Sequence, residues 1–352
     1  MRNTKKYYGA LCIAVMAATI ISGCGSTAKK EQTSKSTPQT KLTEISSDAA
    51  DTEATAQANP TDAPVKASKS SKKIYVNKTF VSKSTEKNVY QETYTPASNA
   101  KSPDSLVSWN DTSIKQKIVE FVTQATDPAS SDYIPPEDRI VVTDIDGTLI
   151  AEKAVKINND KMTKKTPGEV RDYLLKHQND YFDESKNRKY CEIVYKPMVE
   201  MYEYLKANDF DIYFVSGNCN SLTYAWANYY FNADYAHSIG SNLILISDDS
   251  KGVKMGPSGK YEGCWNEVKS YRIYNQIGKC PVLGFGNSDG DVHMLSWIKT
   301  NPDYKSLSVM INHDDDKREY AYSVDSITKA CKQNGILNAK MSKNFKQVFM
   351  NE

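Results

Sequence analysis

The sequence has no excess of charge of either sign. Its 352 residues include 45 Lys and Arg against 43 Asp and Glu, which gives a formal net charge of +2. Nucleic-acid-binding domains usually present a clustered basic face, and this balance offers none. The composition therefore argues against nucleic acid as a partner. With 39% hydrophobic residues and 23 tyrosines, part of the chain must still form a well-packed core.

The N-terminus lacks an apolar run of the length that spans a membrane, about 20 residues. The run from Gly9 to Ile21 is shorter and follows the basic residues Arg2, Lys5 and Lys6. A basic segment before a short apolar one is typical of a signal peptide. An ordinary secretory signal and a buried helix remain the alternatives for this segment.

The end of this run resembles the lipobox of bacterial lipoproteins, on the residues Ile21-Ser22-Gly23-Cys24. The resemblance implies cleavage after residue 23 and a lipid on Cys24. Two or more acyl chains anchor a protein stably to a bilayer. We therefore expect a signal peptide at residues 1–23 and an extracytoplasmic protein that is lipid-anchored to the bacterial cell membrane.

The chain also has no CxxC pair. Beyond Cys12 and Cys24, its seven cysteines leave an odd, irregularly spaced set, namely Cys191, Cys219, Cys264, Cys280 and Cys331. Such a set predicts neither a disulfide framework nor a zinc site. Small buried thiols are the preferred interpretation.

Aromatic residues are absent from Gly25 to Ile74, where Ser, Thr, Lys, Ala, Gln and Pro dominate. A segment of this composition cannot bury enough apolar surface to offset the entropy of ordering it. The residues just beyond are only slightly richer in aromatics. We expect residues 24–104 to form a disordered tether and residues 105–352 to form one domain.

The domain alternates short apolar runs with amphipathic segments. The predicted strands are Ile140–Val142, Ile212–Val215, Val282–Phe285 and Leu307–Ile311. The predicted helices begin near Ser113 and Pro197, span Asn266–Ile277, and return near Ser326–Gln333. This alternation predicts an α/β fold, a Rossmann-like parallel sheet flanked by helices. Ligands of such sheets bind at the carboxyl ends of the strands.

The strand at Ile140 runs directly into Asp144-Ile145-Asp146-Gly147-Thr148. Residues i and i+2 of an extended segment point the same way, so Asp144 and Asp146 should project together. Two neighbouring carboxylates repel each other, which predicts a divalent cation or a raised pKa on one of them. A strand end followed by an ordinary Asp-Gly turn is the structural alternative.

Polar residues follow the later strands too. Ser216-Gly217-Asn218 comes after one strand, and its backbone N–H groups could accept an anion. Lys269 lies on the helix before another strand, which ends in Gly286-Asn287-Ser288-Asp289-Gly290-Asp291. The side-chain oxygens of this segment suit Mg²⁺. Each segment alone has a plain alternative as a turn or a solvated lysine.

Together the four motifs (Asp-Ile-Asp-Gly-Thr, Val-Ser-Gly, the helical Lys269 and Gly-Asn-Ser-Asp-Gly-Asp) resemble those of the haloacid dehalogenase superfamily, in their order and in their places at strand ends or on the expected helix. The likeness is closest to its phosphoserine-phosphatase-like branch and covers roughly residues 105–350. It implies that Asp144 attacks phosphorus and that Asp146 acts as general acid and base. It further implies that Ser216, Gly217, Thr148 and Lys269 bind the phosphoryl group.

The resemblance also implies a Mg²⁺ cofactor held by Asp144, Asp146 and Asn287, with Asp291 either at the metal or orienting Lys269. Many relatives carry an acidic ligand where this chain has Asn287, so the site loses one negative charge. Residues 150–196 are expected to form a small helical cap. Within it Glu152, Lys153 and Tyr195 are candidates for substrate contact, with solvated surface as the preferred interpretation.

The segment that begins at His313-Asp314-Asp315-Asp316 suggests a second metal site, but a strand end with capping acidic residues is preferred. The expected function is a Mg²⁺-dependent phosphomonoester hydrolase with a small phosphorylated substrate. A non-catalytic lipoprotein that binds phospho-ligands and a phosphotransferase to an alcohol acceptor are the alternatives. The substrate and the oligomeric state do not follow from the sequence.

Overall fold

The computed structural model describes residues 82–352, except 153–156, 158–161, 163–164, 244, 249–251 and 256–260. The expected signal peptide, the lipidation site Cys24 and the tether up to residue 81 lie outside the described residues. The described residues belong to one compact unit, Ser70–Glu352. None of the helices they form is long and apolar enough to cross a membrane.

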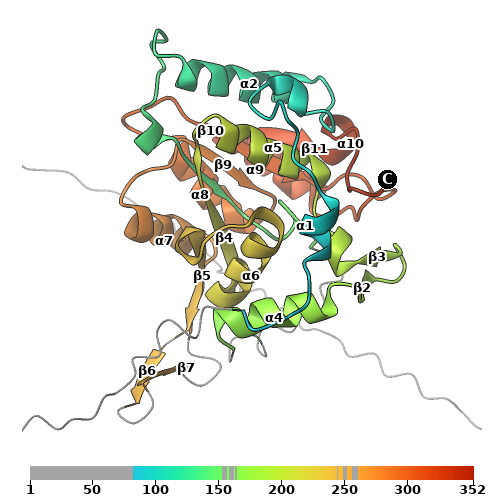
Figure 1. The fold of residues 1–352 in the computed structure, drawn as a ribbon. Helices are drawn as coiled ribbons and strands as arrows, with labels where there is room; N and C mark the ends of the chain where they lie inside the picture. The colour runs from blue at the N-terminus through green and yellow to red at the C-terminus, as the bar shows by residue number, and fades with distance from the viewer. Residues whose placement is uncertain are drawn as a thin grey trace, which may run out of the picture. The chain divides into compact units, whose positions relative to one another are not determined.

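A sheet forms the centre of the fold (Figure 1). It has seven strands in the order β11-β10-β9-β1-β4-β5-β8. Six strands are parallel, and β8 (Tyr261–Glu262) pairs antiparallel with β5 at one edge. The parallel strands are β1 (Ile140–Thr143), β4 (Asp211–Cys219), β5 (Ser238–Leu243), β9 (Leu283–Gly286), β10 (Leu307–Asn312) and β11 (Leu337–Lys340). The predicted Rossmann-like α/β fold is confirmed.

Helices cover both faces of the sheet. Successive strand residues point to opposite faces, and apolar side chains occur on both, so each face needs helices to bury it. Val141 and Phe214 enter one apolar core, and their neighbours Val142 and Val215 enter another. The first core takes side chains from α2 (Ser113–Thr126), α5 (Lys196–Ala207) and α6 (Asn220–Phe231). The second takes them from α7 (Glu267–Ile277), α8 (Val292–Ile298) and α9 (Val324–Asn334).

The helices and strands predicted from periodicity all form, with small shifts at their ends. One local prediction is wrong, because Ser216-Gly217-Asn218 lies inside β4 and not in a turn after it. The register between β4 and β5 shifts between Val215 and Cys219, which is where the strand departs from regular pairing. The sequence analysis also missed β5, whose Ser, Gly and Asn residues have low strand propensity.

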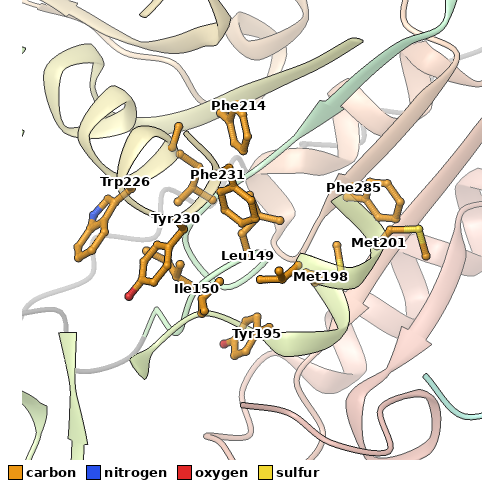
Figure 2. Close-up of a cluster of buried hydrophobic side chains, with 14 of the residues drawn as sticks. Leu149, Ile150, Tyr195, Met198, Met201, Phe214, Trp226, Tyr230, Phe231 and Phe285 are labelled. Carbon is orange, nitrogen blue, oxygen red and sulfur yellow. The ribbon is translucent and has the colours of Figure 1, made fainter. Parts of the chain in front are cut away.

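The cap region contains both a helix and a hairpin. Helix α4 (Pro167–His177) packs on α6 and is followed by β2 (Tyr181–Asp183) and β3 (Arg188–Lys189), so the cap is only partly helical (Figure 1). Leu149 and Ile150 lie at its base among side chains from α5 and α6 (Figure 2). The cap therefore shares its hydrophobic core with the main domain.

Residues 82–104 differ from the expected tether, since they pack on the domain. Their helix α1 (Val89–Thr93) buries Tyr90, whose ring meets Tyr230 of α6 edge-on at 4.9 Å. The Asn88 amide donates to Tyr229 O at 2.8 Å, and the Tyr94 hydroxyl donates to Glu203 at 2.7 Å. A few aromatic anchors order this polar segment, although its composition resembles a linker.

The remaining described elements are short. They are the hairpin of β6 (Leu245–Asp248) with β7 (Gly252–Met255), helix α10 (Met341–Asn344), and the 3₁₀ turns Pro103–Ser105, Pro136–Asp138, Tyr190–Glu192, Tyr235–His237 and Asp289–Asp291.

Candidate active site

The strand order changes direction at β1. The chain passes from β1 to β4 and β5 on one side, then returns to β9 on the other. In open α/β sheets, such a switch point opens a crevice at the carboxyl ends of the strands. Asp144 follows β1 at this point, and its backbone N–H donates to Phe285 O of β9 at 3.0 Å. The topology thus places Asp144 between Ser216 of β4 and Asn287 after β9.

Asp144 and Lys269 form a buried ion pair. The Lys269 ammonium lies 2.5 Å from Asp144 Oδ1, 2.6 Å from Asp291 Oδ1 and 3.3 Å from Val215 O. Lys269 is 3% exposed and Asp144 is 6% exposed. Burial disfavours the ammonium, but the carboxylates of Asp144 and Asp291 outweigh it and raise the pKa of Lys269.

The same cluster affects Asp144. Burial and the carboxylate of Asp291 raise the pKa of Asp144 well above its usual value, although Lys269 opposes them. With both carboxylates ionised, the cluster would carry one negative charge more than the Lys269 ammonium compensates, which is why the acid form of Asp144 is favoured. A cation beside Asp144 would remove that imbalance and favour the ionised carboxylate.

Asp146 faces β4. Its Oδ2 accepts hydrogen bonds from Ser216 Oγ at 2.9 Å and from Asn218 Nδ2 at 2.7 Å. Burial raises the pKa of Asp146 to about 6, against the lowering effect of the Ser216 hydrogen bond. A carboxyl with this pKa can both donate and accept a proton near neutral pH.

Asn287 completes a cluster of oxygen atoms on the other side of Asp144. One end of its amide lies 3.0 Å from Asp146 O, 3.2 Å from Asp144 Oδ2 and 3.2 Å from Thr148 Oγ1. When Oδ1 occupies this end, it faces Asp146 O and Asp144 Oδ2, and no hydrogen bond joins the three oxygens because none of them carries a donor proton. When the amide is rotated, Nδ2 donates to them instead.

The spacing of these oxygens fits a metal ion. An octahedral Mg²⁺ with ligands at about 2.1 Å has neighbouring oxygens about 3 Å apart. The set combines a carboxylate, a backbone carbonyl and an amide oxygen, which are the ligand types that Mg²⁺ takes. Among the described residues no group of three or more His, Cys, Asp or Glu side chains could hold a metal, so any site here depends on the carbonyl and the amide.

The contacts of Asp291 favour an orienting role. Its Oδ1 binds Lys269, and its Oδ2 accepts from the backbone N–H groups of Asn287 at 3.1 Å and Ser288 at 3.0 Å. The Ser288 hydroxyl donates to the same oxygen. Both carboxylate oxygens are thus engaged, and the prediction of Asp291 as a direct metal ligand does not fit these contacts.

The proposed phosphate-binding residues are near the site, but two have other contacts. The Ser216 hydroxyl donates to Asp146, and the fully buried Thr148 hydroxyl lies 3.5 Å from Asp144 Oδ2. Gly217 adjoins the ring of Trp265, a residue that is 45% exposed and that the sequence analysis did not single out. Direct contact of these residues with phosphate stays a prediction.

The cap candidates have different positions. Glu152 lies at the site, where Asn287 Nδ2 is 3.3 Å from its Oε2. Tyr195 is fully buried in the core, so the expectation of a surface position is wrong for it. Lys153 lies outside the described residues.

His313 is held by protein groups. Its Nε2 donates to Gly147 O at 2.6 Å, its Nδ1 lies 3.1 Å from Glu319 Oε2, and its ring stacks on Tyr322 at 4.3 Å. The sequence analysis named Asn218 only for its backbone N–H and missed the contact of its side chain with Asp146, and it did not name Tyr322 or Glu319 as neighbours of the site. Only Asn218 gave a local signal, because it follows Ser216 by two residues in an extended segment.

No protein-family model matches the chain, and no curated protein matches it either. Among solved structures, a conserved protein of unknown function from Anaerococcus prevotii is similar, with 14% identity, a TM-score of 0.41, and 68% of this chain and 96% of that chain covered. Cytosolic 5'-nucleotidase IIIB, in its structure bound to cytidine, is similar at 13% identity and a TM-score of 0.33, with 64% and 84% covered. At these values neither protein's function is transferred to this chain.

Proposed function

We propose that the protein is a Mg²⁺-dependent phosphomonoester hydrolase of the haloacid dehalogenase type. The observation that carries this proposal is the position of the Asp144 carboxylate at the switch point of the sheet. One of its oxygens lies against the Lys269 ammonium, and the other lies 3.2 Å from the Asn287 amide, whose same end is 3.0 Å from Asp146 O. The four motifs of the sequence support the same function.

In the first step, an oxygen of Asp144 attacks phosphorus, and the bond from phosphorus to the ester oxygen breaks. Asp146 gives its proton to the leaving alkoxide, a role that suits a pKa of about 6. Lys269 lies where it can neutralise charge on the phosphoryl oxygens. The product is an aspartyl-phosphate and a free alcohol.

In the second step, water attacks the phosphorus of the aspartyl-phosphate. Asp146, now ionised, takes a proton from that water, and the bond from phosphorus to Asp144 breaks. This releases inorganic phosphate and restores both carboxyl groups to their starting states. The hydrogen bonds from Ser216 and Asn218 keep Asp146 oriented in both steps.

Mg²⁺ would be held by Asp144 Oδ2, Asp146 O and Asn287 Oδ1. When bound, it would supply positive charge against the phosphoryl oxygens. The lipobox supports a further part of the proposal, which is that a lipid on Cys24 anchors the enzyme outside the cytoplasm. A small phosphorylated molecule would then be its substrate.

A substrate screen tests the proposal. The full chain is incubated with Mg²⁺ and a panel of aryl and alkyl phosphates, with and without EDTA, and phosphate release is measured. We expect release that EDTA abolishes and an excess of Mg²⁺ restores. Added acceptor alcohol separates transfer from hydrolysis, since transfer yields a new ester.

Trapping the intermediate makes the test specific. The Asp146→Asn variant keeps the nucleophile but lacks the base for water attack, so an aryl phosphate should leave a phosphoryl group on Asp144. Intact-mass and peptide mass spectrometry locate it. A folded protein that releases no phosphate from any substrate, or a phosphoryl group on another residue, would contradict the proposal.

A further inference from the structure

The amide of Asn287 has a second end, which faces away from Asp144. With Oδ1 towards Asp144 and Asp146, Nδ2 lies 3.3 Å from Glu152 Oε2 and 3.2 Å from the Tyr322 hydroxyl. The Asn287 side chain is buried, so its two ends meet only these protein groups and the oxygen cluster. Which end faces the cluster decides whether the site can take a cation.

The partners on this outer side are not equivalent as donors and acceptors. The oxygens of a carboxylate only accept hydrogen bonds, and Glu152 presents one of them to Asn287. The Tyr322 hydroxyl has a single proton, which it donates to Glu152. Tyr322 can then only accept from Asn287. Both partners therefore require a donor, Nδ2, at the outer end of the amide.

From this network we infer that Glu152 and Tyr322 are positioning residues that hold Asn287 Oδ1 towards the metal site. Glu152 also places one negative charge directly behind the amide, where it compensates for the neutral ligand at Asn287. This inference rests on the proposed function, because it concerns the same Mg²⁺ site.

Neighbouring contacts keep this network in place. The Tyr322 ring stacks on His313, and His313 Nε2 donates to the carbonyl of Gly147, the residue after Asp146. Gly147 itself leaves room for the network, since a Cβ there would lie 2.1 Å from Asn287 Nδ2 and 2.7 Å from the Tyr322 hydroxyl. One packed unit thus joins both chain segments that carry the proposed ligands.

The test is a double-mutant cycle on Mg²⁺ affinity, measured by calorimetry on the full chain. Glu152→Gln puts an amide, which can donate as well as accept, where only an acceptor stood. Either end of the Asn287 amide can then find a partner on this side, so Asn287 loses its orientation and Mg²⁺ binding weakens roughly 10- to 100-fold. In the Asn287→Asp background both ends of the ligand are oxygens and orientation no longer matters. There the Glu152 carboxylate faces a second carboxylate, so Glu152→Gln should leave Mg²⁺ affinity unchanged or raise it.

Two further variants separate positioning from general effects. Tyr322→Phe keeps the ring stacked on His313 but loses the hydroxyl, so it should weaken Mg²⁺ binding while kcat at saturating Mg²⁺ stays near that of the wild type. Glu137→Gln removes the same charge from an exposed position before β1 and should change neither value.

The outcomes distinguish the inference from the function on which it rests. An equal weakening by Glu152→Gln in both backgrounds would show a plain charge effect and overturn the positioning role. No weakening in the wild-type background would overturn it as well. If the wild-type chain binds no Mg²⁺ and releases no phosphate, the proposed function fails, and the inference fails with it.

Discussion

The two sides of Asp144 are built differently. On the side of β4 and α7, full charges set the geometry, with the Lys269 ammonium between the carboxylates of Asp144 and Asp291. On the side of β9, the neutral amide of Asn287 depends for its direction on Glu152 and Tyr322. Opposite charges attract each other over several ångströms, so the ion pair fixes the positions of its side chains. An amide, by contrast, can rotate by half a turn with almost no change in shape. We therefore expect substitutions of neighbouring residues to change the geometry of the charged side little, and to change the orientation of the Asn287 amide more.

The largest effect is expected at the residue that both sides share. Asp144→Asn should lower turnover by roughly 10⁴-fold or more, because the amide cannot attack phosphorus. Initial rates with an aryl phosphate, together with thermal unfolding to confirm the fold, measure this. Activity near that of the wild type would remove Asp144 from the mechanism.

On the charged side, Lys269→Met should destabilise the fold by roughly 3–5 kcal/mol, since it leaves two buried carboxylates without their partner. Urea unfolding gives the free energy of unfolding. The double variant Lys269→Met/Asp291→Asn removes one of those carboxylates. It should recover part of the stability and none of the activity; equal stability of the single and double variants would argue against a shared charge cluster.

On the amide side, Gly147→Ala tests the close approach of Asn287. Gly147 has φ +79°, and the added Cβ would clash with Asn287 and Tyr322. Gly278→Ala is the matched control, because Gly278 has φ +75° and nothing within 4 Å of the added atom. The control should lose about 1 kcal/mol from its backbone strain. Gly147→Ala should lose roughly 1–3 kcal/mol more, and it should also weaken Mg²⁺ binding.

Asp146 belongs to both sides, because its carboxyl binds Ser216 and Asn218 and its backbone carbonyl faces Asn287. The pKa of its carboxyl is about 6. Because the acid form protonates the leaving group, formation of the aspartyl-phosphate from alkyl phosphates should slow about tenfold per pH unit above that pKa. Aryl phosphates with good leaving groups should not show this fall. Single-turnover rates against pH compare the two substrate classes, and identical profiles would contradict the acid role.

The smallest effect is expected at a partly exposed pair outside the candidate active site, His237 and Asp211. The Asp211 carboxylate, 3.0 Å away, raises the pKa of His237. A raised folded-state pKa gives stability below the unfolded pKa, and this stability is lost as pH rises through the folded value. Because both side chains are partly exposed, His237→Gln should lose at most about 0.5 kcal/mol at about pH 5.5 and nothing at about pH 8.5. A constant loss across pH would point to packing instead.

The motif residues on both sides, Asn287 included, could be predicted from the sequence, whereas the partners that orient the Asn287 amide could not. Asp144, Asn287 and Asp291 follow apolar strands, and parallel strands bring their carboxyl ends together, so the motif residues meet as expected. Lys269 meets Asp144 from the adjacent helix α7. Glu152 and Tyr322 have no such local signal. They lie 170 residues apart in the sequence and meet only in the folded chain, where both contact the amide of Asn287.

The segment of residues 82–104 shows a second limit of composition. Its polar sequence predicts a tether, yet Tyr90 is buried against Tyr230, and Asn88 and Tyr94 bind α6 and α5 on either side of it. Composition averages over a window, whereas one well-placed aromatic side chain can contribute about 2 kcal/mol or more by burial. Strand β5 shows the same limit, because its composition predicts weak strand propensity, yet it forms through pairing with β4.

The two edges of the sheet bear on how copies of the protein behave at high concentration. At one edge, β5 is paired with β8, and at the other the short strand β11 ends at Lys340. Short edges, and a lysine at an edge, discourage strand addition from a second molecule. Both edges of this sheet thus have features that disfavour edge-to-edge aggregation.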